Sequence, residues 1–169
     1  APTYVAGATL VLDAMVDPLR MLQVIERRRI TSFAAVPVIF EMMLQHPALA
    51  DHDLSSLRVV ASGGASVPES LILGLQGVGV PMSQGYGLTE TGPVVCVNRP
   101  ESNLPASIGR PMPGIEVRIG DNDELLTRSR CLMRGYWKNE EATRAIIDAD
   151  GWLHSGDKAR LDEQGHFTI

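Results

Sequence analysis

The residues best suited to chemistry gather between positions 83 and 93, in the stretch Ser-Gln-Gly-Tyr-Gly-Leu-Thr-Glu-Thr-Gly-Pro. Tyr86 offers a flat aromatic face, Thr89 a hydroxyl and Glu90 a carboxylate, and Gly85 and Gly87 flank the tyrosine. Glycine brings no side chain to bury and costs backbone entropy on folding. The composition therefore predicts a loop that lets the backbone approach a ligand closely.

A nucleotide suits this stretch together with two other segments. A second glycine turn stands at residues 63–65 (Gly-Gly-Ala), and Asp157 ends the sequence His-Ser-Gly-Asp. A carboxylate such as Asp157 accepts hydrogen bonds from both hydroxyls of a ribose, and the Thr89 hydroxyl can donate to a phosphate. Magnesium prefers oxygen ligands such as the Glu90 carboxylate. With Tyr86 lying along the base, these residues predict a nucleotide-binding α/β domain.

Composition excludes several other classes of protein. The chain has 15 basic and 20 acidic residues, for a net charge of −5, which disfavours nucleic acid as a partner. Hydrophobic residues make up 44% of its 169 residues, as in a globular domain. No apolar run approaches the ~20 residues of a membrane span. Lys138 and Lys158 are the two lysines, so a mechanism that needs a catalytic lysine must use one of them or a lysine from elsewhere.

The cysteines bear on the cellular compartment. Cys96 and Cys131 lie far apart and form no metal-binding or redox motif. We therefore expect two unpaired thiols in a reducing cytoplasm. The first residues lack the charged-then-apolar order of a signal peptide. The sequence begins without methionine, which is typical of a processed chain or of a piece of a longer one.

Elements that position these residues can be read from the apolar pattern. Short apolar runs alternate with helical segments in the first half, which predicts a parallel sheet with flanking helices. Asp17 and Pro18 mark one helix start as N-cap and first position. Both glycine segments follow predicted strands, and open parallel sheets bind ligands at the carboxyl ends of their strands. The predicted strands cover residues 8–12, 32–36, 57–62 and 80–84, and the helices run from 18, from 37 to 45 and from 67 to 77.

The second half has a different character. Predicted strands at 115–119 and 124–127, a helix at 139–147 and short strands after 151 indicate a mostly β, barrel-like subdomain. We therefore expect an α/β parallel-sheet subdomain at residues 1–106 and a mostly β subdomain at residues 107–169 that carries Asp157.

Two alternatives of other classes remain open. In a serine hydrolase, Ser83 would lie in a motif one residue short of a nucleophile elbow, with Asp157 and His166 following in hydrolase order. An elbow serine must lead into a helix, which Tyr86-Gly87 and Gly92-Pro93 disfavour. The other alternative is a non-catalytic nucleotide-binding module.

Residues 84–91 (Gln-Gly-Tyr-Gly-Leu-Thr-Glu-Thr) resemble the hallmark motif of the adenylate-forming superfamily. That family includes acyl-CoA synthetases, luciferases and the adenylation domains of peptide synthetases. Within it, the residues of this motif look most like those of fatty-acid ligases and luciferases. Four further blocks resemble the family's in the same order over nearly the whole chain. They cover residues 57–65, 107–114, 133–137 and 151–157.

The resemblance implies an activity and its cofactors. Such enzymes use ATP and Mg²⁺ to convert a carboxylic acid to an acyl-adenylate, and most pass the acyl group to coenzyme A. Thr89 would contact the α-phosphate and Glu90 the magnesium, which makes them the implied catalytic pair. Magnesium and hydrogen-bond donors must offset the repulsion when a carboxylate attacks a phosphate.

The implied binding residues surround these two. Gly64 and Ala65 would flank the adenine, Tyr86 would stack near it, and Asp157 would hold the ribose. Gly85 and Gly87 would leave room for the acyl group, with Val94 and Val95 lining the pocket further along. These side chains are small or apolar and offer no charged anchor for an ammonium group, which favours a fatty or aryl acid over an amino acid.

The sequence also departs from the family pattern. The family's glycine-rich phosphate loop and its catalytic lysine, which precede and follow these blocks, do not occur in the sequence, and neither Lys138 nor Lys158 stands in that lysine's place. Asp123 and Ser129 replace glycines usual in the family. We therefore predict the central part of the large N-terminal domain, a fragment that does not complete the reaction without the rest of its own chain.

Overall fold

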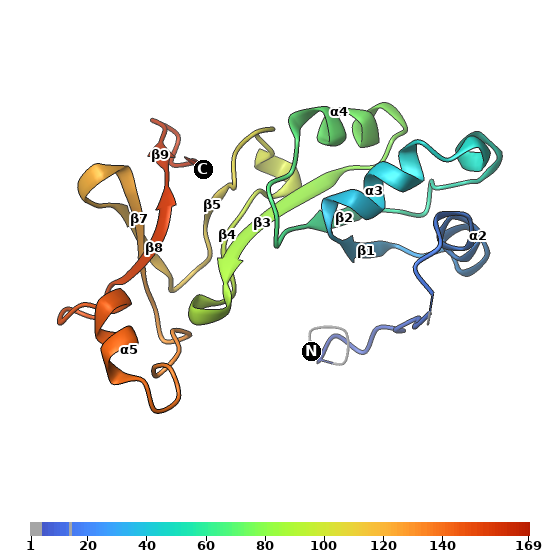
Figure 1. Cartoon of the computed structure of the whole chain (residues 1–169). Coiled ribbons are helices and arrows are strands. Elements are labelled where there is room, and N and C mark those ends of the chain that lie inside the picture. The colour runs from blue at the N-terminus through green and yellow to red at the C-terminus, as the bar shows by residue number, and fades with distance from the viewer. Residues whose placement is uncertain (1–4, 14) are drawn as a thin grey trace.

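A five-stranded sheet organises the first half of the chain in a computed structural model that describes residues 5–13 and 15–169. The first three strands are mutually parallel, whereas the last two pair antiparallel, so the sheet is mixed. Figure 1 shows its longest strand crossing the centre of the molecule. In spatial order the strands are β1 (Ser32–Ala35), β2 (Val59–Ser62), β3 (Met82–Leu88), β4 (Gly92–Val97) and β5 (Arg110–Pro111).

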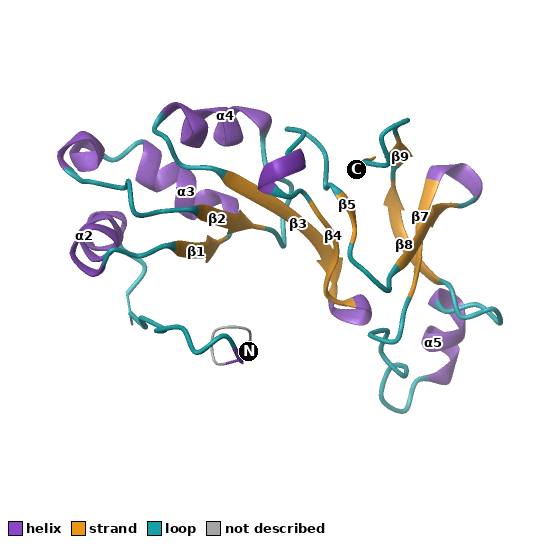
Figure 2. Ribbon diagram, turned by 180° about the vertical axis from the view of Figure 1, so that it is seen from behind, coloured by secondary structure: helices purple, strands orange, loops and turns teal. Residues whose placement is uncertain are grey.

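Three helices accompany this sheet: α2 (Pro18–Arg28), α3 (Pro37–Leu44) and α4 (Glu69–Gly77). Figure 2 shows α3 and α4 together on one face, with α2 near the β1 edge. Their apolar sides bury Phe40 and Ile72 against Val60 and Met82 of the sheet. Burial of each such side chain contributes about 1.5–3 kcal/mol, so this core holds the strands in place. The predicted parallel sheet with flanking helices is confirmed.

The start of α2 follows the predicted capping pattern. Asp17 has an extended backbone, and its carboxylate accepts a hydrogen bond from the Arg20 amide at 2.7 Å, while Pro18 occupies the first turn. The last turn carries Arg27 and Arg28, where cations favour the helix dipole.

Replacing Asp17 with alanine should lower the free energy of unfolding by about 1 kcal/mol, because the amides of the first turn lose their cap. Urea denaturation followed by circular dichroism measures the change. Asp51→Ala, an exposed aspartate whose side chain makes no hydrogen bond, is the control and should change stability little. Equal losses in both variants would contradict the capping role.

The second half forms an open antiparallel sheet. It contains β6 (Glu116–Ile119), β7 (Glu124–Arg128) and β8 (Leu153–Lys158), with α5 (Glu140–Ile146) and the short pair β9 (Arg160–Leu161) and β10 (Phe167–Thr168). Within the described residues these strands close no barrel. Leu125, Ala159 and Phe167 share a buried core with Val95 and Cys96 of β4, so the second half packs directly against the first sheet.

The predicted first strand is wrong. Residues 8–12 form no strand and pair with no other described segment, and Leu10 and Leu12 are exposed. An apolar run becomes a strand only where a neighbour completes its backbone hydrogen bonds. Apolar composition alone was therefore not sufficient evidence for a strand here.

The predicted loop at 83–93 is also largely wrong. The chain continues as β3 to Leu88, turns through η2 (Thr89–Thr91) and returns at once as β4. A Cβ on Gly87 would lie 2.6 Å from the Pro93 carbonyl oxygen, and the strand register shifts between Tyr86 and Leu88. The glycine therefore serves a close approach of two strands at a bulge, which composition did not distinguish from a loop.

Candidate functional site

Three segments distant in sequence carry the predicted site residues. Gly64 and Ala65 lie exposed in the turn after β2, and Asp157 lies on β8. Gly85, Tyr86 and Gly87 are in β3, and Thr89 and Glu90 form its continuation in η2. Two contacts join the segments: one between the turn after β2 and β3, and one between β3 and β8.

The first contact is a backbone approach. A Cβ on Gly63 would lie 2.8 Å from the Gly85 carbonyl oxygen, so only glycine lets this turn lie against β3. The next residue, Gly64, has a φ of +76°, a conformation that glycine adopts without strain. The turn thus follows the carboxyl end of β2, at the edge where open parallel sheets bind ligands.

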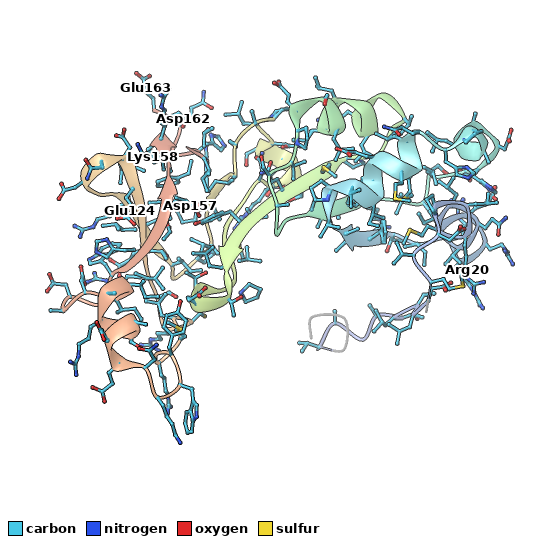
Figure 3. The ribbon with its side chains drawn as sticks, viewed as in Figure 1. Arg20, Glu124, Asp157, Lys158, Asp162 and Glu163 are labelled. Atoms are coloured by element: carbon cyan, nitrogen blue, oxygen red, sulfur yellow. The ribbon has the colours of Figure 1, made fainter. Side chains whose placement is uncertain are left out.

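The second contact is a hydrogen bond across the two halves of the molecule. The Tyr86 hydroxyl donates to Asp157 Oδ2 at 2.7 Å, although the residues are 71 positions apart. Burial and, secondarily, the hydrogen bond to Asp157 raise the pKa of Tyr86 well above its usual range, so the phenol stays protonated. Figure 3 shows Asp157 on β8 near Glu124 of β7, on the opposite side of the molecule from Arg20. Tyr86, the residue implied to stack near the base, and Asp157, the residue implied to hold the ribose, therefore lie together.

Replacing Tyr86 with phenylalanine should lower the free energy of unfolding by about 1–2 kcal/mol, because a half-buried carboxylate loses a hydrogen-bond donor. Tyr136→Phe is a matched control, since that tyrosine also donates to a carboxylate but is 39% exposed. We expect the control to lose less than about 0.5 kcal/mol because water replaces the bond. Urea titrations measure both variants, and equal losses would contradict a linking role for Tyr86.

Glu90 is held by two hydrogen bonds from the segment that contains Met133 and Tyr136. Its Oε1 accepts a hydrogen bond from the Tyr136 hydroxyl at 2.8 Å, and its carbonyl oxygen accepts one from the Met133 amide at 2.8 Å. The hydrogen bond to Glu90 raises the pKa of Tyr136. Thr89 beside it is exposed and available to a ligand.

The carboxylate of Glu90 suits magnesium as one ligand of several. The part of the chain that the structure describes contains no group of three or more acidic, histidine or cysteine side chains that could hold a metal ion. Magnesium bound through one carboxylate takes its other ligands from substrate phosphates and water. The donor set therefore fits a metal that arrives with a nucleotide rather than one caged by protein.

Two supporting residues were missed by sequence reasoning. Thr91 is buried, and its hydroxyl oxygen accepts from the Leu88 amide at 2.9 Å and lies 3.0 Å from the Leu88 carbonyl, which fixes the η2 turn. A threonine three residues after the end of a strand is a recognisable local signal for such a turn. Tyr136 had no local signal, because its partner Glu90 lies 46 residues away.

The structure contradicts the serine hydrolase alternative. Ser83 lies within β3, is buried, and donates its hydroxyl to the Asn98 carbonyl oxygen. Neither ring nitrogen of His166 makes a hydrogen bond, and its Nδ1 lies 3.4 Å from Asp162 instead. Since Asp157 binds Tyr86, no Ser-His-Asp relay exists.

Cys96 is buried and Cys131 exposed, and both are free thiols. Burial raises the pKa of Cys96 to about 12, so its thiol is unreactive. None of the described helices is both long and apolar enough to cross a bilayer.

The structure defines an α/β domain in which an aspartate of a second sheet binds the strand that carries Tyr86, near the carboxyl ends of the parallel strands. The sequence model described as "AMP-binding enzyme" matches residues 1–137. The chain therefore belongs to the family of AMP-binding enzymes, which confirms the resemblance to adenylate-forming proteins.

Similar proteins extend over almost all of the chain. A 3-[(3aS,4S,7aS)-7a-methyl-1,5-dioxo-octahydro-1H-inden-4-yl]propanoyl:CoA ligase of Mycobacterium tuberculosis is 42% identical over 96% of this chain and 33% of its own length. The crystal structure of the N-terminal domain of FACL13 from Mycobacterium tuberculosis matches with a TM-score of 0.90 at 30% identity, over 99% of this chain and 45% of that one. An anthranilate CoA ligase, AuaEII, in complex with anthranoyl-AMP matches with a TM-score of 0.88 at 30% identity, over 96% and 34%. The chain spans about a third of the length of the curated relatives it matches.

Proposed function

We propose that this chain is part of an ATP-dependent acid–thiol ligase, which converts a carboxylic acid to an acyl-adenylate and transfers the acyl group to coenzyme A. The observation that carries the proposal is the hydrogen bond between Tyr86 and Asp157, because it brings the implied base-side and ribose-side residues together from separate sheets. Relatives named as CoA ligases or as a CoA synthase support the same activity.

The proposed roles are those that the family resemblance implies for each residue. Asp157 accepts the ribose hydroxyls, and the backbone at Gly64 and Ala65 borders the adenine. Thr89 donates to the α-phosphate, and Glu90 binds the Mg²⁺ that ATP brings. When bound, the metal neutralises charge on the phosphates, and these residues orient the nucleotide for attack by the acid.

The proposed acid has a hydrophobic body, either fatty or aryl. An added Cβ on Gly85 would meet only the Cys96 carbonyl oxygen, at 3.9 Å, and Val94 is 38% exposed. Gly87, by contrast, lies against the Pro93 backbone and leaves no free space. Val95, which the resemblance implied as a second lining residue, has no exposed surface and belongs to the core between the two halves. We also infer a cytoplasmic location, which two unpaired thiols support.

Exchange of radioactive pyrophosphate into ATP tests the proposal. With a panel of fatty and aryl acids, we expect no exchange above background from the 169 residues alone, because neither Lys138 nor Lys158 stands in the place of the family's lysine. The product of the gene's full open reading frame should exchange with hydrophobic acids. Exchange by the 169 residues alone would contradict the incomplete-site proposal, and absence of exchange by the full product would favour a non-catalytic nucleotide-binding module.

A further inference from the structure

The strand that carries Asp157 is irregular at that residue. β8 pairs with β7 up to His154 and again at Lys158. Between these two positions β8 has three residues where β7 has one, so the register shifts and residues 155–157 form a bulge. A bulge re-aims side chains and interrupts the ladder of backbone hydrogen bonds. Asp157 therefore reaches Tyr86 from a part of β8 that needs support from outside the ladder.

The carboxylate of Glu124, on the neighbouring strand β7, supplies such support. Its Oε1 accepts a hydrogen bond from the Gly156 amide at 2.9 Å, and its Oε2 lies 2.9 Å from His154 Nδ1. A carboxylate only accepts hydrogen bonds, so Nδ1 is the donor in this pair. Figure 3 shows Glu124 beside Asp157 on the two strands. One side chain thus ties both the start and the middle of the bulge to β7.

These contacts favour the charged form of Glu124. The hydrogen bond with His154 lowers the pKa of Glu124, and the bond from the Gly156 amide acts in the same direction. By contrast, the Asp157 amide donates to the Ser155 hydroxyl oxygen at 3.1 Å, which is a contact within the bulge. Glu124 therefore connects the residue directly before Asp157 to the rest of the sheet.

We propose that Glu124 is a positioning residue, which holds Asp157 where it binds Tyr86 and, in the proposed function, the ribose. Gly156 has a φ of +76° and many accessible conformations, so the hydrogen bond to its amide limits how the bulge can turn. The ribose part rests on the proposed function, whereas the contact of Asp157 with Tyr86 does not. Because Glu124 acts through Asp157, its removal should matter only while Asp157 is present.

A double-mutant cycle of stability tests the positioning role without a nucleotide. Urea titrations at pH 8 compare the effect of Tyr86→Phe in the wild-type chain with its effect in a Glu124→Ala background. If Glu124 places Asp157 against Tyr86, the stability lost through Tyr86→Phe should fall by at least half in that background. Equal losses in the two backgrounds would show that Asp157 keeps its place without Glu124, and would overturn the inference.

Two further backgrounds separate positioning from a general weakening of the sheet. In Glu124→Gln the amide oxygen can accept from Gly156 while the NH₂ group donates to a neutral His154 ring, so Tyr86→Phe should again cause its full loss. Glu116→Ala removes a carboxylate of the same sheet that binds Arg128, and should also leave that loss unchanged. An equal reduction in the Glu116→Ala and Glu124→Ala backgrounds would overturn the positioning role.

Binding of AMP, measured by NMR titration, extends the test to the site. Glu124→Ala should weaken AMP binding by about 10-fold, as for the loss of one well-aligned hydrogen bond. In an Asp157→Ala background the same substitution should weaken it no further. Equal weakening in both backgrounds would overturn the inference. Wild-type affinity in Asp157→Ala alone would instead contradict the ribose assignment, on which the urea cycle does not depend.

Discussion

Replacing Asp157 with alanine is expected to weaken AMP binding to this chain by about 100-fold. In its proposed role the carboxylate accepts two hydroxyls of the ribose, and hydrogen bonds to a charged group contribute about 1.5–3 kcal/mol each. Alanine removes both bonds and also releases the Tyr86 hydroxyl, which donates to Asp157 in the protein without nucleotide. Isothermal titration calorimetry with AMP measures the change.

Two further variants separate binding from folding. Asp121→Ala removes an exposed aspartate of the same half whose side chain makes no hydrogen bond, and it should bind AMP as the wild type does. Tyr86→Phe keeps the carboxylate but removes its present donor, so it should weaken AMP far less than Asp157→Ala. Unchanged AMP affinity in a folded Asp157→Ala variant would contradict the ribose assignment.

Secondary-structure elements were predictable from sequence where local physics decides them. The Asp17-Pro18 pair predicted the start of α2, and the apolar runs at 57–62 and 115–119 predicted β2 and β6 within two residues. Caps, prolines and apolar periodicity act over a few residues, so the sequence displays them directly.

Features that depend on distant partners were not predictable in this way. The run at 8–12 has strand-like composition but pairs with no segment among the described residues. The glycines of β3 suggested a loop because the sequence does not display their close approach to Pro93, which is a tertiary contact. Residue types alone predicted a nucleotide-binding domain, and the resemblance of several blocks to a family added the predicted activity and acid pocket. The contact of Tyr86 with Asp157 and of Glu90 with Tyr136 required coordinates.

The contact between the two halves of the molecule depends on Gly109, which is not one of the predicted site residues. Gly109 has a φ of +83°, and a Cβ there would lie 2.1 Å from the backbone carbon and oxygen of Val97. Its carbonyl also accepts from the Phe167 amide at 2.9 Å, while the Ile108 amide donates to the Phe167 carbonyl at 2.8 Å. This residue therefore joins β4 to the last strand of the chain, over the core that both halves share.

Replacing Gly109 with alanine should lower the free energy of unfolding by more than about 4 kcal/mol, a large part of the ~5–15 kcal/mol typical of a domain. Backbone atoms cannot move aside as a flexible side chain can, so the strands must separate and expose the shared core. Gly114→Ala is the matched control, because its φ of +82° is nearly the same but no atom lies within 4 Å of the added Cβ. That variant carries only the left-handed strain of about 1–2 kcal/mol. Urea unfolding of the two variants separates steric clash from backbone conformation, and similar losses in both would show that the β4 contact does not hold the halves together.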